Sequence, residues 1–111
     1  MKQSILVALL AGTVCAAAGQ VAFKLGATGR ESLISFFNGW VALGLTLYLL
    51  GTALWLFALS KASLTVVYPF TALTFVLVYG AGVLFLGELT NARQLSGVGL
   101  ILAGLYLITV K

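Results

Sequence analysis

Two polar residues near the end of the first apolar run have types and a spacing that suit ligand binding. Gln20 and Lys24 are four residues apart, so a helix places them on one face, one turn from each other. The lysine offers a positive charge, and the glutamine amide can hydrogen-bond hydroxyls or amides. Together they can hold a ligand that is both charged and polar.

Each of these two residues also has a structural explanation. Lys24 can extend its ammonium group into the lipid headgroups and anchor the helix end. Gln20, one turn deeper, can donate a hydrogen bond to a neighbouring helix and hold the two helices together. Both explanations stay open at the level of sequence.

A second cluster of polar residues lies just before the last apolar run and in its first turn. Thr90 is the expected N-cap of a helix that carries Arg93 and Gln94 in its first turn. A helix N-terminus attracts anions, so Arg93 and the pair in the first helix together suit a phosphate at interface depth. Glu88 either forms a structural ion pair with Arg93 or Lys24, or balances an amino group on the ligand.

The first apolar run also carries a regular stripe of residues. The stripe follows one helical face and consists of every fourth residue: Ala8, Gly12, Ala16, Gln20 and Lys24. Along it the residues change from small to polar. Small residues permit close approach of a second helix in a membrane. The same residues can instead leave a groove that a ligand enters.

Aromatic and polar residues share faces of the second and third apolar runs. These faces comprise Gly44, Tyr48, Gly51 and Trp55 in one run, and Tyr68, Thr71, Phe75, Tyr79 and Gly82 in the next. Such faces are usually packing surfaces, although tyrosine and tryptophan also stack against sugar rings. We count Tyr68 with Gln20, Lys24, Glu88 and Arg93 as candidate substrate-binding residues.

The elements that must position these residues are membrane helices. Of the 111 residues, 62% are hydrophobic and 7% are charged, and the mean hydropathy is +1.19. A soluble domain is about 45–50% apolar and about 25% charged. We therefore expect an all-α integral membrane protein in which residues 1–111 form one domain. Its four spans are expected at residues 4–25, 36–59, 64–87 and 91–110, each near the 20 or so residues that cross a bilayer.

Two features of the third span bear on its shape. Pro69 lies in its early part, where a missing amide hydrogen costs least. Gly80 and Gly82 are expected to let the helix bend at mid-membrane. The first span, despite a lysine and an apolar stretch at its start, is expected to be a retained helix rather than a cleaved signal.

The basic residues are balanced between the two ends of the predicted bundle. We call the end with both termini and the second loop the terminal side, and the end with the first and third loops the loop side. The terminal side carries Lys2, Lys61 and Lys111, and the loop side carries Lys24, Arg30 and Arg93. This balance gives almost no orientation signal, which favours insertion in both directions and an antiparallel eight-helix dimer. If Lys24 is embedded and uncounted, a terminal side facing inward is weakly favoured.

Several functions lack the residues they require. The chain has no histidine and one cysteine, which leaves a His/Cys metal site unsupported and excludes an intrachain disulfide. Its basic residues are scattered, so nucleic acid is not an expected partner. Neither carboxylate, Glu31 or Glu88, lies at mid-span, where a proton-driven cation exporter needs one. No nucleophile–base pair or phosphate loop is present, and we expect neither an enzyme nor a bound cofactor.

Three segments resemble a known family. They are "AGQVAFK" at residues 18–24, "VVYPF" at 66–70 and "LGELTNARQLSGVGLILAG" at 86–104. With them the chain resembles the small four-helix branch of the drug/metabolite transporter superfamily (EamA-like and small-multidrug-resistance-like). Within it, the likeness is strongest to the subunits of the 4-amino-4-deoxy-L-arabinose-phosphoundecaprenol flippase. The third segment is shared widely, whereas the first is more specific, because small multidrug resistance proteins carry a glutamate in the first helix.

The resemblance implies a flippase in the bacterial inner membrane that moves a polyprenyl-phosphate-linked aminosugar by alternating access. It implies an antiparallel dimer of four-helix units, and a homodimer or a heterodimer with a related subunit both fit. By this likeness Gln20 and Lys24 lie near the lipid headgroup. The alternative function is export of cationic or small polar solutes, as in the small multidrug resistance proteins. A third interpretation is an assembly subunit whose stripe binds only a partner's helices.

Overall fold

The computed structural model describes residues 2–110, and these residues form helices joined by short connections. The elements are α1 (Gln3–Ala27), η1 (Ile34–Phe36), α2 (Gly39–Lys61), α3 (Leu64–Val67), α4 (Phe70–Leu84) and α5 (Ala92–Thr109). Taking α3 and α4 together as one span, Leu64–Leu84, four helical segments are long and apolar enough to cross a membrane. The expected all-α membrane architecture with four spans is confirmed.

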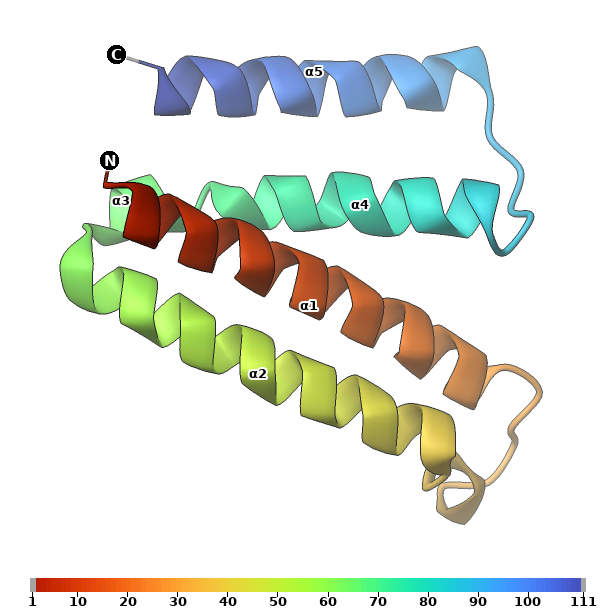
Figure 1. The fold of residues 1–111 in the computed structure, drawn as a ribbon. Coiled ribbons are helices and arrows are strands. Elements are labelled where there is room, and N and C mark those ends of the chain that lie inside the picture. The colour runs from red at the N-terminus through yellow and green to blue at the C-terminus, as the bar shows by residue number, and fades with distance from the viewer. Residues whose placement is uncertain (1, 111) are drawn as a thin grey trace.

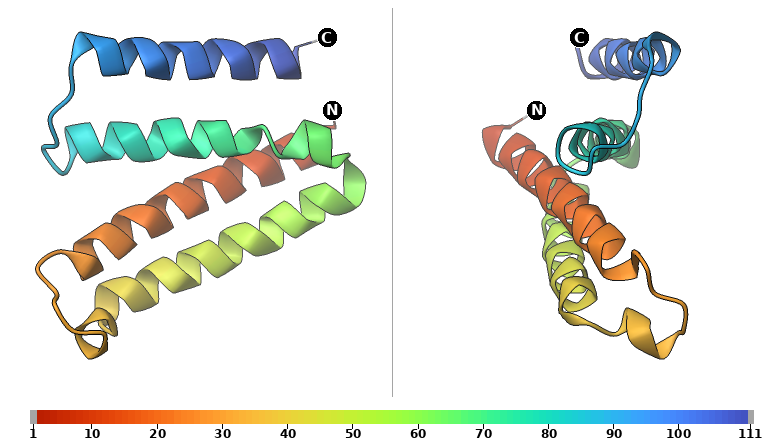
Figure 2. Two further views of the ribbon diagram at one scale, coloured as in Figure 1. Left: turned by 180° about the vertical axis from the view of Figure 1, so that it is seen from behind. Right: turned by 90° about the vertical axis from the view of Figure 1, so that its right-hand side faces the viewer.

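The helices are arranged in a row rather than in a closed bundle. Helices α1 and α2 form an antiparallel hairpin, α4 lies beside α1, and α5 lies outermost against α4 (Figures 1 and 2). Both termini and the α2–α3 connection lie at one end, which is the terminal side (Figure 1). Toward the loop side, the end of the hairpin diverges from the end of the α4–α5 pair (Figures 1 and 2).

Two asparagines determine where α2 and α5 begin. The Asn38 side-chain oxygen accepts a hydrogen bond from the Val41 amide, so α2 begins at Gly39 rather than at residue 36. In the same way the Asn91 side chain accepts from the Gln94 amide at 2.9 Å. The expectation that Thr90 caps the last helix was therefore wrong by one residue, because the asparagine next to it provides the cap.

The third span is interrupted at Tyr68 and Pro69, between α3 and α4. Pro69 has no amide hydrogen to donate to the carbonyl four residues earlier, so the helical hydrogen-bond pattern breaks there. The Thr71 amide instead donates to the Tyr68 carbonyl at 2.9 Å. Helix α4 then continues through Gly80 and Gly82, so the break in this span lies near the terminal side rather than at mid-membrane.

Glycines allow α1 and α2 to pack closely. A Cβ atom on Gly12 would lie 3.3 Å from the Gly51 carbonyl oxygen, and one on Gly19 would lie 3.0 Å from the Gly44 carbonyl oxygen. A Cβ on Gly26 would lie 2.6 Å from the Val41 side chain. These glycines recur every seven residues, so we call this contact the glycine seam; it lets the two backbones approach as small residues do in membrane helix pairs.

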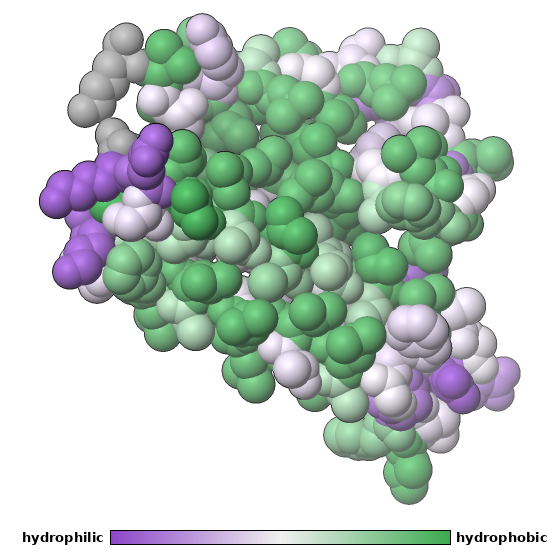
Figure 3. Space-filling view, in the orientation of Figure 1, coloured by the Kyte–Doolittle hydropathy of each residue, from purple (hydrophilic) through white to green (hydrophobic). Residues whose placement is uncertain are grey.

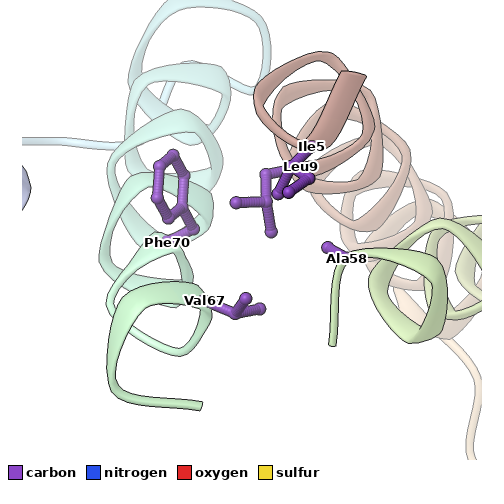
Figure 4. Close-up of a cluster of buried hydrophobic side chains, with 5 residues drawn as sticks. All are labelled: Ile5, Leu9, Ala58, Val67 and Phe70. Carbon is purple, nitrogen blue, oxygen red and sulfur yellow. The ribbon is translucent and has the colours of Figure 1, made fainter. Parts of the chain in front are cut away.

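A small apolar cluster joins the hairpin to the third span near the terminal side. It consists of Ile5 and Leu9 from α1, Ala58 from α2, Val67 from α3 and Phe70 from α4 (Figure 4). Leu9, Ala58 and Val67 are completely buried. The cluster fixes the three spans at this end, and toward the loop side the buried residues of the described chain are small ones such as Gly19, Ala22 and Gly44.

The surface is that expected of a protein in lipid. A broad apolar band covers the middle, and hydrophilic side chains gather toward the two ends (Figure 3). Large side chains such as Leu49, Leu100 and Leu107 are exposed within the spans. Such an extensive apolar surface is unfavourable in water and is matched by acyl chains in a bilayer.

Candidate functional site

A cavity of about 430 Å³ lies between the hairpin and the third span. Its size is within the range of about 300–1,000 Å³ that is typical of small-molecule sites. Its lining comes from α1 (Gly12, Thr13, Ala16), α2 (Tyr48, Gly51, Thr52, Trp55) and α3–α4 (Leu64, Tyr68, Thr71, Thr74). We call this space the central cavity. It brings together parts of the two aromatic faces expected from the sequence: Tyr48, Gly51 and Trp55 from one face, and Tyr68 and Thr71 from the other.

Three hydroxyl groups of the central cavity, those of Thr13, Thr52 and Thr71, are oriented by their own helices. The Thr13 hydroxyl donates to the Leu10 carbonyl at 2.8 Å, and the Thr52 hydroxyl donates to the Tyr48 carbonyl at 2.8 Å. The Thr71 hydroxyl donates to the Tyr68 carbonyl at 2.9 Å. Because these hydrogens are engaged, the hydroxyl oxygens remain as acceptors. The cavity therefore suits a ligand that donates hydrogen bonds, such as a sugar or an amine.

The stripe on α1 connects this cavity to the loop side. Gly12 and Ala16 line the cavity, and Gln20 and Lys24 follow one and two turns further along the same helical face. Lys24 lies in the last turn of α1, about 12 Å beyond Ala16 at 1.5 Å per residue. Both polar side chains are exposed. The small residues of the stripe were expected either to permit close helix contact or to line a groove. Gly12 does both, since it belongs to the glycine seam and also lines the central cavity.

Glu88 lies in the connection between α4 and α5, which folds back onto α4. Its amide donates to the Gly82 carbonyl at 3.0 Å, and its carboxylate lies where a side chain on residue 82 would be, 2.9 Å from a Cβ built there. The turn depends on Gly87, which has a φ of +70° that only glycine adopts easily. Gly82 thus accommodates Glu88.

Tyr79 ties the same connection to α5. Its hydroxyl is hydrogen-bonded to the Thr90 hydroxyl and donates to the Gln94 side-chain oxygen at 3.3 Å. Thr90, which the sequence suggested as a cap, therefore bonds a tyrosine instead. Arg93 lies in the same first turn of α5 and is exposed.

The structure divides the predicted polar cluster into two groups. Gln20 and Lys24 belong to the hairpin, and Glu88 and Arg93 belong to the α4–α5 corner. Within residues 2–110 no side-chain hydrogen bond joins the two groups, because the hairpin and the α4–α5 pair diverge toward the loop side (Figure 1). Tyr68 lies apart from both groups, at the wall of the central cavity. The roles of these five residues remain predictions.

Of the four threonines that line the cavity, sequence reasoning placed only Thr71 on a candidate face and missed Thr13, Thr52 and Thr74. Threonine is common in apolar helices, where its hydroxyl can bond the preceding turn, so these residues did not stand out. Two spacings nevertheless carried a signal. Thr13 lies seven residues before Gln20, and Thr52 lies between Tyr48 and Trp55 at helical intervals, so each shares a face with a residue already considered.

The fold and the cavity define a class: a multi-pass helical membrane protein with a hydroxyl-lined cavity between its spans. Relatives give the class more detail. The chain is 39% identical over 72 residues to the probable 4-amino-4-deoxy-L-arabinose-phosphoundecaprenol flippase subunit ArnE of Serratia proteamaculans (strain 568), covering 65% of this chain and 63% of that protein. It is also 39% identical over 70 residues to the proteins of the same name in Yersinia pestis (strain Pestoides F) and Yersinia pseudotuberculosis serotype O:1b (strain IP 31758), covering 63% of this chain and 61% of each.

These similarities confirm the predicted resemblance to subunits of this flippase. The alignments span somewhat less than two thirds of the length of the curated relatives. No family model matches the chain, so the wider superfamily resemblance stays a prediction, and no solved structure matches it. The relatives are named as parts of a transporter rather than an enzyme. With its four apolar helices, the chain is a multi-pass protein of the bacterial inner membrane.

Proposed function

We propose that residues 1–111 form one transporter domain, which is a subunit of a flippase for a polyprenyl-phosphate-linked aminosugar. One observation carries the proposal: Gly12 and Ala16 of the α1 stripe line the hydroxyl-lined central cavity, and Gln20 and Lys24 follow them in the same stripe toward the loop side. A polar headgroup that leaves the interface meets a cation, then an amide, and then hydroxyl acceptors. The relatives are named for a substrate with this chemistry.

Each candidate residue then has a distinct role. Lys24 pairs with the lipid phosphate, and Gln20 hydrogen-bonds the phosphate or the sugar one turn deeper. Tyr68 presents its ring to the sugar in the central cavity. At the α4–α5 corner Arg93 offers a second phosphate contact, and Glu88 balances the amino group of the sugar.

The separation of the two polar groups favours a second subunit. In one chain the hairpin group and the α4–α5 group diverge, so a complete headgroup site needs residues from another copy or from a related subunit. An antiparallel pair places one such site at each membrane face, in keeping with the balanced basic residues. Rocking of the two units then passes the headgroup from one face to the other, which is alternating access.

Lys24 provides the sharpest test because Lys61 is a matched control. Both lysines lie in the last turn of a spanning helix, at opposite ends of the hairpin. A charge-assisted hydrogen bond contributes about 1.5–3 kcal/mol, or about ten- to a hundredfold in affinity. We therefore expect Lys24→Ala to weaken binding of a polyprenyl-phosphate aminosugar by at least about tenfold, measured by native mass spectrometry. Lys61→Ala is expected to leave it unchanged, and Lys24→Arg to retain much of it.

Gln20→Leu tests the deeper residue, because leucine suits this depth and preserves the helix. We expect weaker headgroup binding with unchanged membrane insertion. If Lys24→Ala and Gln20→Leu both bind the lipid like the wild type, the lysine is an anchor and the function proposed for this face is wrong.

Orientation tests the assembly. Single cysteines placed in the loops of a Cys15→Ala background, and labelled from each side of the membrane, report which way each copy inserts. Labelling from both sides supports an antiparallel homodimer. One fixed orientation would contradict the antiparallel homodimer, and a heteromer with a related subunit or a parallel pair would replace it.

A further inference from the structure

A second cavity, of about 520 Å³, lies on the other side of the third span, between α3–α4 and α5. Its lining is mainly apolar. From α3–α4 it includes Thr65, Tyr68, Pro69, Thr71 and Ala72, and from α5 it includes Leu100, Ile101, Gly104, Leu105 and Ile108. The α5 residues recur at intervals of three and four, so they form one face of that helix. We call this space the lateral groove.

The lateral groove and the central cavity share a wall. Tyr68 and Thr71 line both, so these two residues separate a hydroxyl-rich space from an apolar one. They lie at the break between α3 and α4, where Pro69 interrupts the helix. Irregular backbone within a membrane span is found where it lines a cavity or a substrate path. The break therefore lies where the two spaces meet.

We propose that the lateral groove binds the isoprenoid chain of the substrate while its headgroup occupies the central cavity. The proposal rests on the proposed function and adds the place of the tail. Three observations support it: the α5 side of the groove is aliphatic, the groove adjoins the hydroxyl-lined central cavity at Tyr68, and none of residues 92–109 is buried. A groove open to lipid lets a long tail enter from the side, and the tail then gains van der Waals packing against the groove wall.

Gly104 offers a way to fill the groove without disturbing the protein. It lines the groove, and a Cβ atom built on it meets nothing within 4 Å in the described part of the chain. Gly99 lies on the same helix, is equally unobstructed and does not line the groove. Leucine at residue 104 therefore occupies the space of the tail, and leucine at residue 99 is a control of the same chemistry.

The experiment compares two phosphate lipids that differ only in their tails: a long-chain polyprenyl monophosphate and geranyl phosphate. Binding to the purified wild type and variants in nanodiscs is measured by native mass spectrometry. We expect the wild type to prefer the long chain because it makes more packing contacts, and Gly104→Leu to lower long-chain affinity by at least about tenfold while geranyl phosphate binds as before. Gly99→Leu is expected to retain the preference.

The outcomes separate this proposal from the headgroup proposal. Lys24→Ala is expected to weaken both lipids equally, since both carry the phosphate. If it weakens neither while Gly104→Leu abolishes the chain-length preference, the tail site stands and the headgroup assignment fails. If Gly104→Leu keeps the chain-length preference, the groove is not a tail site. If it changes only the oligomeric state, the groove is covered by a second protein copy instead.

A second measurement uses the wild-type protein, so it does not depend on folding of a variant. A polyprenyl phosphate with a photoreactive group in its tail is bound and irradiated, and the labelled peptides are identified. Labelling concentrated at Leu100, Ile101 and Leu105 supports the proposal. Labelling that is spread evenly over the exposed faces of α2 and α5 contradicts it.

Discussion

The α1–α2 hairpin and helix α5 use the same residue type in opposite ways. Gly12 and Gly19 of α1 pack directly against the backbone of α2. In α5, Gly97 and Gly104 have the same seven-residue spacing, yet a Cβ atom on either would meet nothing within 4 Å in the described chain. Burial differs in the same way. In the most apolar stretch of α1, 44% is buried inside the protein, whereas 0% of the corresponding stretch of α5 is buried.

This difference shows what glycine spacing means in a membrane helix. A seven-residue interval presents a smooth face, and a smooth face permits either close helix contact or an open groove. Which of the two occurs depends on whether another helix of the same chain reaches that face. In the hairpin α2 packs along the glycine face of α1, whereas α5 makes its main contacts with α4.

The largest effect is expected when the two glycine environments are filled with the same side chain. Gly19→Leu forces a side chain against the Gly44 carbonyl and the Tyr48 amide, and overpacking of this kind costs about 1–3 kcal/mol. Gly97→Leu meets open space, and its effect is expected within about 0.5 kcal/mol. Unfolding in detergent, followed by circular dichroism, measures both. Equal destabilisation by the two variants would show that the hairpin is not closed by its glycines.

A medium effect is expected from the two capping asparagines. Asn38 caps α2 and also donates to the Gly26 carbonyl at 2.9 Å and to the Ser35 carbonyl at 3.0 Å, whereas Asn91 caps α5 through the Gln94 amide. Loss of a cap costs about 0.5–2 kcal/mol. We expect Asn38→Ala near the upper end of this range and Asn91→Ala near the lower end, in the same unfolding assay.

Aspartate at the same two positions sharpens this test. Asn38→Asp keeps the capping oxygen but loses the amide donor to Gly26, so we expect it to recover only part of the stability. Asn91→Asp retains the contact to Gln94 and is expected to behave like the wild type. Full recovery by Asn38→Asp would mean that the bond to Gly26 contributes nothing.

The smallest and most local effect is expected at the α4–α5 corner. Tyr79→Phe removes a hydroxyl that bonds Thr90 and Gln94, and a typical hydrogen bond contributes about 0.5–1.5 kcal/mol. Because the corner is exposed, we expect the lower part of this range and faster amide hydrogen exchange in residues 85–91. Exchange in α1 and α2 serves as the internal control. Faster exchange there as well would show that the corner and the hairpin unfold together.

Patterns within single helices predicted much of this fold. The apolar runs gave four spans, and the structure extends the first to Ala27 and ends the third at Leu84. Local chemistry gave the start of the last helix to within one residue, because Thr90 and Asn91 are both good caps and only the geometry chooses between them. Pro69 was read as tolerated near a helix start, whereas its missing amide hydrogen divides the span.

The candidate site was less predictable, because it depends on how helices meet. The stripe through Gly12, Ala16 and Gln20 was visible, and so were the two aromatic faces. Parts of these faces meet around one cavity because the helices pack together at Leu9 and Val67. The sequence of a single helix does not predict that contact. The divergence that separates Lys24 from Arg93 is likewise a property of the assembled helices.

The uneven packing also bears on how the protein is made. The hairpin is complete once residue 61 has left the ribosome, and its glycine contacts need nothing that is synthesised later. Helix α5 emerges last and makes its main contacts with α4. We therefore expect biosynthesis to proceed in order along the chain, with α1 and α2 associating during insertion. Docking of α5 is then the final step, and it is the step that lipid or a second chain arriving at that time can still redirect.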